Sequence, residues 1–299
     1  MCGIVGLFLK NPKLRPELGG FLATMLTTLS ERGPDSAGFA VYGEARPERI
    51  KLTLRGTGKT DFDAIAAELG RALDADVPVS RRDTHAVLTV PAARAGEARA
   101  ALGRIAPDVA IVGIGRRMEL YKEVGLPAEV AKRFRLGSMS GTHAIGHTRM
   151  ATESAVTTDG AHPYSTGADQ CLVHNGSLSN HNSLRRELMR DGIGFATEND
   201  TEVAAGYLTW RLSHGMTLDA ALKGALADLD GFYTFVVGTE SGFGVLRDLI
   251  ACKPAVMAEA DDYVAFGTEY RALAELPGIE HARVFEPEPA KVYFWDLQQ

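Results

Sequence analysis

Cysteine is scarce in this sequence, and its pattern excludes two kinds of cross-linked fold. Three cysteines occur in 299 residues, Cys2, Cys171 and Cys252, and no CxxC pair is present. An odd count without that spacing argues against a disulfide framework and against a cysteine-rich zinc site. Such cysteine usage is typical of a reducing compartment, so we expect a cytoplasmic protein.

Basic stripes and long apolar runs are also missing. The formal net charge is −6, whereas nucleic-acid and anionic-membrane binders usually carry a basic field. The apolar run at residues 4–9 is far shorter than a membrane span and follows no basic segment. We therefore expect no nucleic-acid partner, no membrane partner, no signal peptide and no anchor.

What is present is an ordinary globular composition with mixed periodicity. Short β-rich runs dominate both ends of the chain and are separated by turn residues. Apolar residues recur at helical spacing in four segments, 17–31, 180–191, 200–213 and 217–229. This order favours an α+β layered fold of antiparallel strands over a parallel βαβ sheet.

The middle of the chain, residues 61–136, has a different pattern. Helical and strand-like segments alternate there, and the last two segments, 119–124 and the residues after Pro127, are predicted as helices. The alternation predicts a small α/β insert inside a domain that spans residues 1–299.

Two glycine-rich segments suggest phosphate binding, and a group of histidines suggests a metal site. The GTGKT segment at 56–60 lacks the leading glycine of a phosphate-binding loop, and the glycines at 113 and 115 lack a third at 118. Both are better explained as turns. Five histidines, at 143, 147, 162, 174 and 181, include no HExxH motif and no suitably spaced carboxylate pair, so no metal site is predicted.

Four polar stretches lie beside predicted strand ends or helix starts, where function tends to be placed on a rigid scaffold. They cover residues 31–39, 147–154, 173–180 and 198–204. Taken singly, each has a structural explanation. Arg149 could be a surface arginine, Asn175 and Gly176 a hairpin turn, and Asp200 a helix N-cap.

Together with Cys2 these stretches supply what side-chain amide hydrolysis requires. Once the initiator methionine is removed, Cys2 offers a thiol nucleophile, and its α-amine, with an ordinary pKa of about 7.7–8.0, offers a base. The Asn175 amide and the Gly176 N–H suit an oxyanion. Arg149 suits an α-carboxylate and Asp200 an α-ammonium. Of free amino acids with a side-chain amide, glutamine fits best.

The same residues carry a family resemblance. The segments MCGIVG, RGPDSAG, HTRMAT, HPYS, VHNGSLSN and NDTEV occur in the order typical of class II, N-terminal-nucleophile glutamine amidotransferases, which the chain resembles. The resemblance implies a four-layer αββα sandwich of two antiparallel sheets. It also implies Cys2 as nucleophile, Asn175 and Gly176 as oxyanion hole, and Arg149 and Asp200 as glutamine-binding residues.

The resemblance extends to the pocket wall. It implies Thr152 and His162 at that wall, and it makes the segment after Arg149 the loop that closes over glutamine. Two positions depart from the family pattern: Met150, where some members carry an aromatic residue, and Glu153, where histidine is common.

The longest matching runs look like the stand-alone amidotransferase subunit of glutamate synthase-like enzymes, in particular N-methylglutamate synthase. That resemblance implies L-glutamine as substrate and ammonia-accepting synthase subunits as partners in a hetero-oligomer. No cofactor is expected in this chain, and FMN and iron–sulfur clusters would belong to the partner subunits. The chain ends at Gln299, soon after its last predicted strand, so we expect no acceptor domain and regard the insert as a candidate docking surface.

Two alternative functions remain open at this point. The first is an N-terminal-nucleophile amidase that acts on another amide, although Arg149 and Asp200 would then have no obvious purpose. The second is a non-catalytic regulatory subunit with the same fold, because a fold by itself does not establish turnover.

Overall fold

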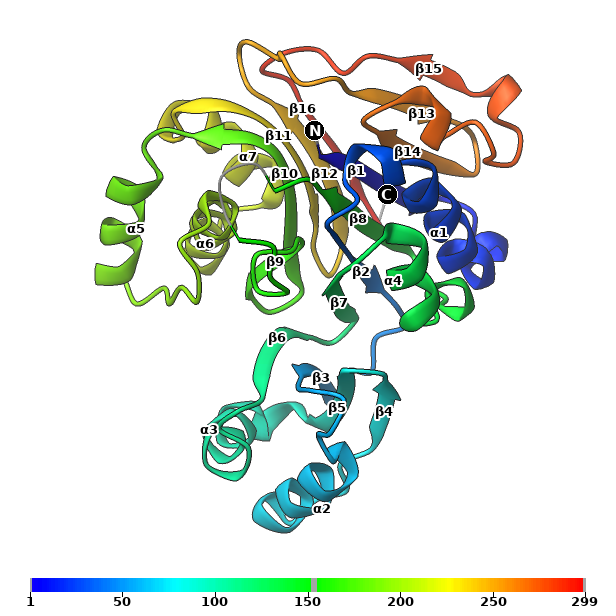
Figure 1. Ribbon diagram of the computed structural model, residues 1–299. Coiled ribbons are helices and arrows are strands. Elements are labelled where there is room, and N and C mark those ends of the chain that lie inside the picture. The colour runs from blue at the N-terminus through cyan, green and yellow to red at the C-terminus, as the bar shows by residue number, and fades with distance from the viewer. Residues whose placement is uncertain (1, 152–154, 298–299) are drawn as a thin grey trace.

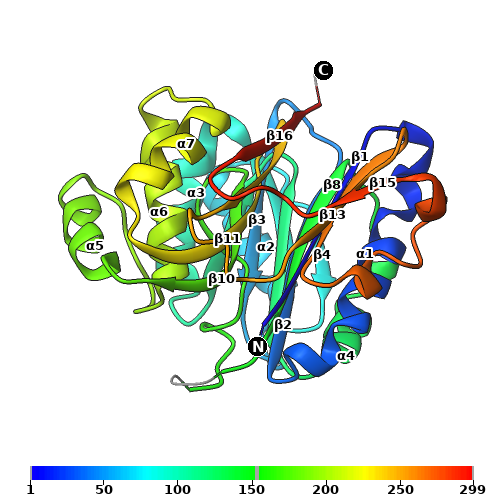
Figure 2. The same ribbon diagram turned by 90° about the horizontal axis from the view of Figure 1, so that it is seen from above.

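The computed structural model describes residues 2–151 and 155–297 (Figure 1). Two antiparallel sheets pack face to face, and helices cover the outer side of each sheet (Figure 2). The expected four-layer αββα sandwich is confirmed. The described helices include none that is both long enough and apolar enough to cross a membrane.

The first sheet surrounds the N-terminal strand. Its seven strands run in the order β15 (Arg283–Phe285), β13 (Val256–Glu259), β14 (Tyr263–Gly267), β1 (Gly3–Leu9), β8 (His143–Arg149), β2 (Ser36–Tyr42) and β7 (Met118–Val124). All residues of β1 are buried because both faces of this strand are covered. Ile4 and Phe8 pack between the two sheets, whereas Val5, Leu7 and Leu9 pack under the helices. The uninterrupted apolar run is typical of such a strand.

The second sheet and the helices complete the layers. The strand order of this sheet is β16 (Val292–Asp296), β12 (Gly242–Arg247), β11 (Gly231–Gly238), β10 (Gln170–Leu178) and β9 (Tyr164–Gly167). The outer helices are α1 (Leu18–Thr28) and α4 (Pro127–Arg133) on the first sheet, and α5 (His181–Arg190), α6 (Asp200–Ser213) and α7 (Leu218–Asp228) on the second. Short 3₁₀ helices lie at Pro12–Glu17, Ser30–Arg32, Ala92–Arg94, Leu136–Ser138, Tyr270–Ala272 and Ile279–His281.

A separate unit projects from the main body between β2 and β7 (Figure 1). Its sheet has the order β4 (Val79–Arg82), β5 (His85–Pro91), β3 (Arg49–Arg55) and β6 (Ala110–Gly115), and its helices are α2 (Phe62–Leu73) and α3 (Ala95–Ile105). These elements enclose an apolar core of their own. We call residues 49–115 the insert. It begins with β3, before the expected boundary at 61, and it ends well before 136.

The segment after the insert was predicted incorrectly. Residues 119–124 were expected to form a helix, but they belong to β7, which pairs along its length with β2 of the main body. Met118 and Leu120 point into the core between the sheets, whereas Tyr121 packs under the outer helices. This alternation has the period of a strand, and the hydrogen bonds of β2 fix it.

Buried histidines should make the fold sensitive to acid. His143 is fully buried, its ring stacks on Tyr42 with centroids 4.1 Å apart, and its Nε2 lies 2.9 Å from the Thr239 carbonyl oxygen. Burial lowers the pKa of His143 to about 3, although the Thr239 contact opposes the shift. The folded protein therefore binds no proton at His143 over a range in which the unfolded chain, with a histidine pKa of about 6.5, does.

We predict that the free energy of unfolding keeps the full contribution of neutral His143 above about pH 6.5. This contribution is lost progressively as the pH is lowered toward about 3. His143→Gln should reduce that slope by up to about 1.4 kcal/mol per pH unit, the contribution of one proton. Urea denaturation at several pH values measures the slope. His281→Gln, at a side chain that is 86% exposed, is the matched control and should keep the wild-type slope.

Candidate active site

One cavity of about 620 Å³ opens at the point where β1, β8, β10 and α6 meet. Six of the seven site residues expected from the sequence line it: Cys2, Arg149, His162, Asn175, Gly176 and Asp200. The seventh, Thr152, lies outside the described residues. The fold thus brings together residues that are separated by almost 200 positions in the sequence.

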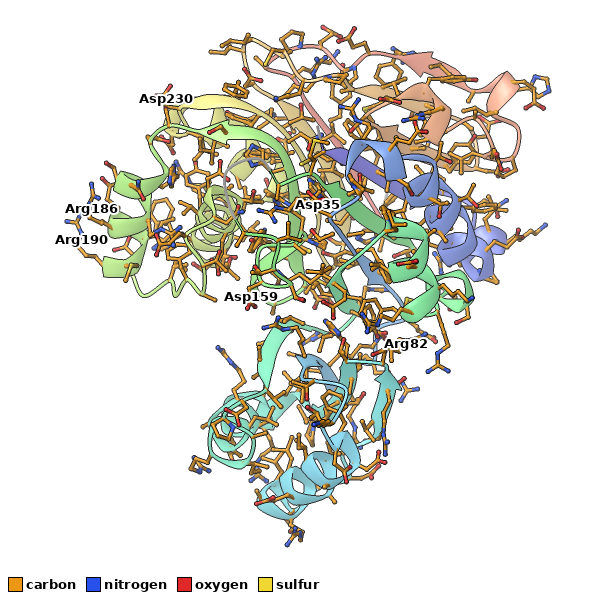
Figure 3. The ribbon with its side chains drawn as sticks, in the orientation of Figure 1. Asp35, Arg82, Asp159, Arg186, Arg190 and Asp230 are labelled. Carbon is orange, nitrogen blue, oxygen red and sulfur yellow. The ribbon has the colours of Figure 1, made fainter. Side chains whose placement is uncertain are left out.

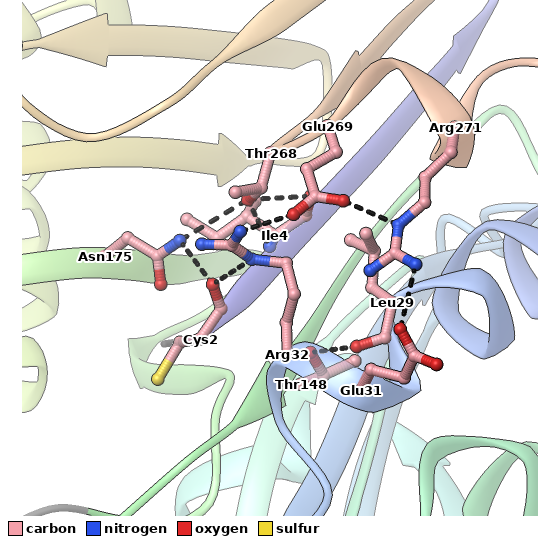
Figure 4. A network of polar contacts seen from close by, with 10 residues as sticks. All are labelled: Cys2, Ile4, Leu29, Glu31, Arg32, Thr148, Asn175, Thr268, Glu269 and Arg271. Carbon is pink, nitrogen blue, oxygen red and sulfur yellow. Dashed lines mark hydrogen bonds and ion pairs between the residues drawn. The ribbon is translucent and has the colours of Figure 1, made fainter.

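Cys2 directly precedes β1 and is half-buried at the cavity. Its Sγ accepts a hydrogen bond from the Met150 backbone N–H over 3.4 Å. Its carbonyl oxygen accepts hydrogen bonds from Arg32 Nε at 3.1 Å and from Asn175 Nδ2 at 3.2 Å (Figure 4). Three segments distant in sequence therefore hold the residue that carries the thiol.

Arg32 and Glu269 are parts of this site that the sequence did not assign. Arg32 forms an ion pair with Glu269, which also pairs with Arg271 over 2.5 Å (Figure 4). Burial alone would raise the pKa of Glu269, but its hydrogen bonds and ion pairs with Arg32 and Arg271 outweigh burial and lower that pKa. The ionised Glu269 thereby holds Arg32 against the Cys2 carbonyl. Arg32 lies in the polar stretch 31–39, which was the available signal, whereas Glu269 lies in none of the four polar stretches.

Asn175 and Gly176 lie inside β10, so the alternative of a hairpin turn is wrong. Gly176 has a φ of +141°, and a Cβ at this position would come within 1.9 Å of the Phe232 carbonyl oxygen, so only glycine fits. The Asn175 amide nitrogen also lies 3.4 Å from Thr268 Oγ1. Asn175 Oδ1 is buried and has no hydrogen-bond partner among the described residues.

Arg149 is the last residue of β8, and only 5% of it is exposed, which excludes a surface arginine. Its Nη1 donates to the Ala155 carbonyl oxygen over 3.4 Å. A Cβ added at Gly160 would come 3.4 Å from the same Nη1, so Gly160 packs directly against the guanidinium group.

Asp200 is the first residue of α6, but it is not the N-cap. Asn199 takes that role, because its side chain accepts from the Thr201 N–H over 2.8 Å. Asp200 Oδ2 accepts instead from the Leu178 N–H of β10 over 2.9 Å. This bond links the helix start to the strand that carries Asn175 and turns the carboxylate toward the cavity wall.

Three histidines, His147, His162 and His174, cluster at the cavity, and His162 and His174 line it. Thr201 Oγ1 lies 2.8 Å from His162 Nε2 and 3.0 Å from His174 Nδ1, and the rings of His147 and His162 are 4.0 Å apart. Burial is the main cause that lowers the pKa of all three, to about 3 for His147. They are therefore neutral at physiological pH.

A metal ion in a protein is usually held by acidic, histidine or cysteine side chains. Within residues 2–151 and 155–297, no group of three such side chains is arranged to hold a metal ion. The lining of the cavity includes one thiol, one guanidinium group, amide and backbone donors, three histidines and three carboxylates, of which that of Asp200 belongs to α6.

Sequence comparisons relate the whole chain to known proteins. It is 63% identical to "Glutamine amidotransferase-like protein GlxB" of Rhizobium meliloti (strain 1021), over 100% of this chain and 99% of that protein. It is 33% identical to a "Putative glutamine amidotransferase" of Methanothermobacter thermautotrophicus, over 98% of this chain and 99% of that protein. Residues 147–275 match the family described as glutamine amidotransferase domain.

Solved structures agree in fold. The glutamine phosphoribosylpyrophosphate amidotransferase from B. subtilis superimposes with a TM-score of 0.61 at 20% identity, over 99% of this chain and 48% of that chain. At this identity the match speaks for the fold alone, whereas the two full-length relatives establish the family. The chain belongs to the glutamine amidotransferase family.

Proposed function

We propose that this protein is a class II glutamine amidotransferase that hydrolyses the side-chain amide of L-glutamine with Cys2 as its N-terminal nucleophile. The observation that carries the proposal is the single cavity lined by Cys2, Arg149, Asn175, Gly176 and Asp200. It combines a nucleophile, oxyanion donors and both partners for an amino-acid head group.

The Cys2 α-amine, freed by removal of Met1, is the proposed base. In the part of the chain that the structure describes, Sγ hydrogen-bonds to the Met150 backbone and to no side chain. The thiol proton passes to the amine as sulfur attacks the amide carbon, and the amine then protonates the leaving ammonia. Water hydrolyses the resulting thioester to glutamate and restores the thiol.

Asn175 and Gly176 are the proposed oxyanion donors. The Asn175 amide nitrogen lies 3.2 Å from the Cys2 carbonyl oxygen, and Gly176 is exposed and lines the same cavity. Donors fixed before reaction stabilise developing negative charge without reorganisation.

Arg149 is proposed to bind the glutamine α-carboxylate, and Asp200 the α-ammonium. Burial of Arg149 strengthens its attraction for an anion, and the fixed position of Asp200 at the helix start orients the partner charge. His162 forms part of the wall. The contribution of Thr152 remains a prediction.

The ammonia is proposed to pass to a partner synthase, of the glutamate synthase-like or N-methylglutamate synthase kind. The proposal rests on the motif resemblance of residues 141–165 and 173–212 to such subunits. FMN and iron–sulfur clusters would belong to the partner subunits, and a cytoplasmic setting would keep the Cys2 thiol reduced.

Cys2→Ala should abolish glutamate release from L-glutamine because it removes the attacking sulfur. The thermal midpoint should stay close to that of the wild type, since Cys2 precedes β1 and contributes little to the core. The assay is run with and without the partner subunits. A diazo-oxonorleucine adduct at Cys171 or Cys252 in place of Cys2 would contradict the assignment, and faster turnover of blocked amides than of glutamine would favour the alternative amidase.

Asn175→Asp should lower kcat by about 10²–10³ with a smaller change in KM, because it replaces an oxyanion donor with a negative charge. Steady-state glutamate release measures both constants. Asn180→Asp is a matched control outside the cavity and should retain wild-type kcat. Equal loss of activity in the two variants would remove Asn175 from the proposed oxyanion site.

Purification of the protein from its native host should recover a complex that contains a flavin-bearing synthase subunit. Mass spectrometry of the copurifying chains and the visible absorption spectrum of the complex provide the measurement. A homogeneous single-chain preparation that releases ammonia at full rate would contradict the partner proposal but not the glutaminase assignment.

A further inference from the structure

The insert contacts one short segment of the main body that forms part of the wall of the active-site cavity. Residues 157–162 lie between β8 and β9, and four of them line the cavity: Thr157, Asp159, Gly160 and His162. We call residues 157–162 the wall segment. Figure 3 shows Asp159 at the border between the main body and the insert.

An ion pair joins the insert to this segment. Arg55, the last residue of β3, places its Nη2 2.6 Å from Asp159 Oδ1. The Arg55 side chain is only 20% exposed, so the contact is partly shielded from water. Arg55 belongs to the insert sheet, whereas Asp159 belongs to the cavity wall.

β7 supports the same segment from beneath. Lys122 Nζ donates to the carbonyl oxygens of Asp159 at 3.2 Å and of Ala161 at 2.8 Å. Burial lowers the pKa of Lys122 to about 8, and the charge of Asp159 opposes that shift. Tyr164 OH donates to the Asp159 carbonyl oxygen as well, over 3.1 Å.

Glu123 provides a second link between the insert and the wall segment. One of its carboxylate oxygens accepts from Thr158 Oγ1, and the other accepts from Thr84 Oγ1 of the insert over 3.2 Å. Arg133 of α4 lies 3.7 Å from the same carboxylate. The wall segment is therefore fixed on two sides by groups that do not themselves touch the cavity.

A movement of the wall segment would change the packing around Arg149, the proposed binding residue for the glutamine α-carboxylate. Gly160 follows Asp159 directly, and a Cβ there would lie 3.4 Å from Arg149 Nη1. We propose that Arg55 is a positioning residue through which the insert, by its ion pair with Asp159, holds the wall segment against Arg149 and so sets the affinity for L-glutamine. This inference rests on the proposed function, because it takes glutamine as the occupant of the cavity.

Isothermal titration of L-glutamine tests the inference, with Cys2→Ala as parent so that the substrate is not consumed. Arg55→Gln in this parent should raise Kd about two- to fivefold, as expected for loss of a partly exposed ion pair. Arg55→Lys should recover part of the loss. Asp159→Asn should weaken binding to a similar extent, and the double variant should be no weaker than the weaker single variant.

Arg94→Gln is the matched control within the insert. It breaks the pair with Glu97 (2.6 Å), which does not contact the wall segment, and should leave Kd unchanged. Thermal midpoints separate a folding defect from a positioning effect, and if Arg55→Gln does not fold, Asp159→Asn and Arg55→Lys carry the test.

The outcomes separate the two proposals. No binding of L-glutamine by the folded parent contradicts the proposed function. Normal binding by the parent with an unchanged Kd in folded Arg55→Gln, or effects that multiply in the double variant, overturns the positioning role alone. A Kd that rises equally in Arg94→Gln also overturns it, because the effect would then be a general response of the insert.

Discussion

The burial of β1 is the constraint on which the site depends. A chain end normally frays, but β1 is hydrogen-bonded to β14 on one side and to β8 on the other. Two of its residues are glycines at which a Cβ would force its neighbours to shift, since a Cβ at Gly3 would lie 2.7 Å from Thr148 Oγ1 and one at Gly6 would lie 2.8 Å from the Phe243 ring. Close packing of the layers around this strand therefore fixes Cys2 at one end of the sandwich.

The cavity is assembled from both sheet layers at that end. Cys2 directly precedes β1 and Arg149 ends the neighbouring strand β8 of the first sheet, whereas Asn175 and Gly176 come from β10 of the second sheet and Asp200 from a helix that covers it. Buried polar groups in this region need partners, and Arg32, Glu269 and the histidines around Thr201 supply many of them. The polar network thus serves both packing and the placement of the thiol.

Local patterns predicted much of the fold, and their failures have a common cause. The outer helices and most strands follow from periodicities contained within a single segment. Residues 119–124 were predicted as a helix, and the pairing of β7 with β2, some 80 positions earlier, makes them a strand. Likewise β3 belongs to the insert because its partners β5 and β6 follow it in the chain.

The sequence by itself determined the chemistry available to this protein: the thiol of Cys2, the Asn175–Gly176 pair, and Arg149 and Asp200 in ordered motifs. Tertiary structure decided which groups hold them. The Arg32–Glu269 pair spans 237 positions, and the contact between Arg55 and Asp159 joins the insert to the cavity wall. Such pairs form only when the packing of the layers brings distant segments of the chain into contact. The periodicity within a single segment does not specify which distant segment it will contact.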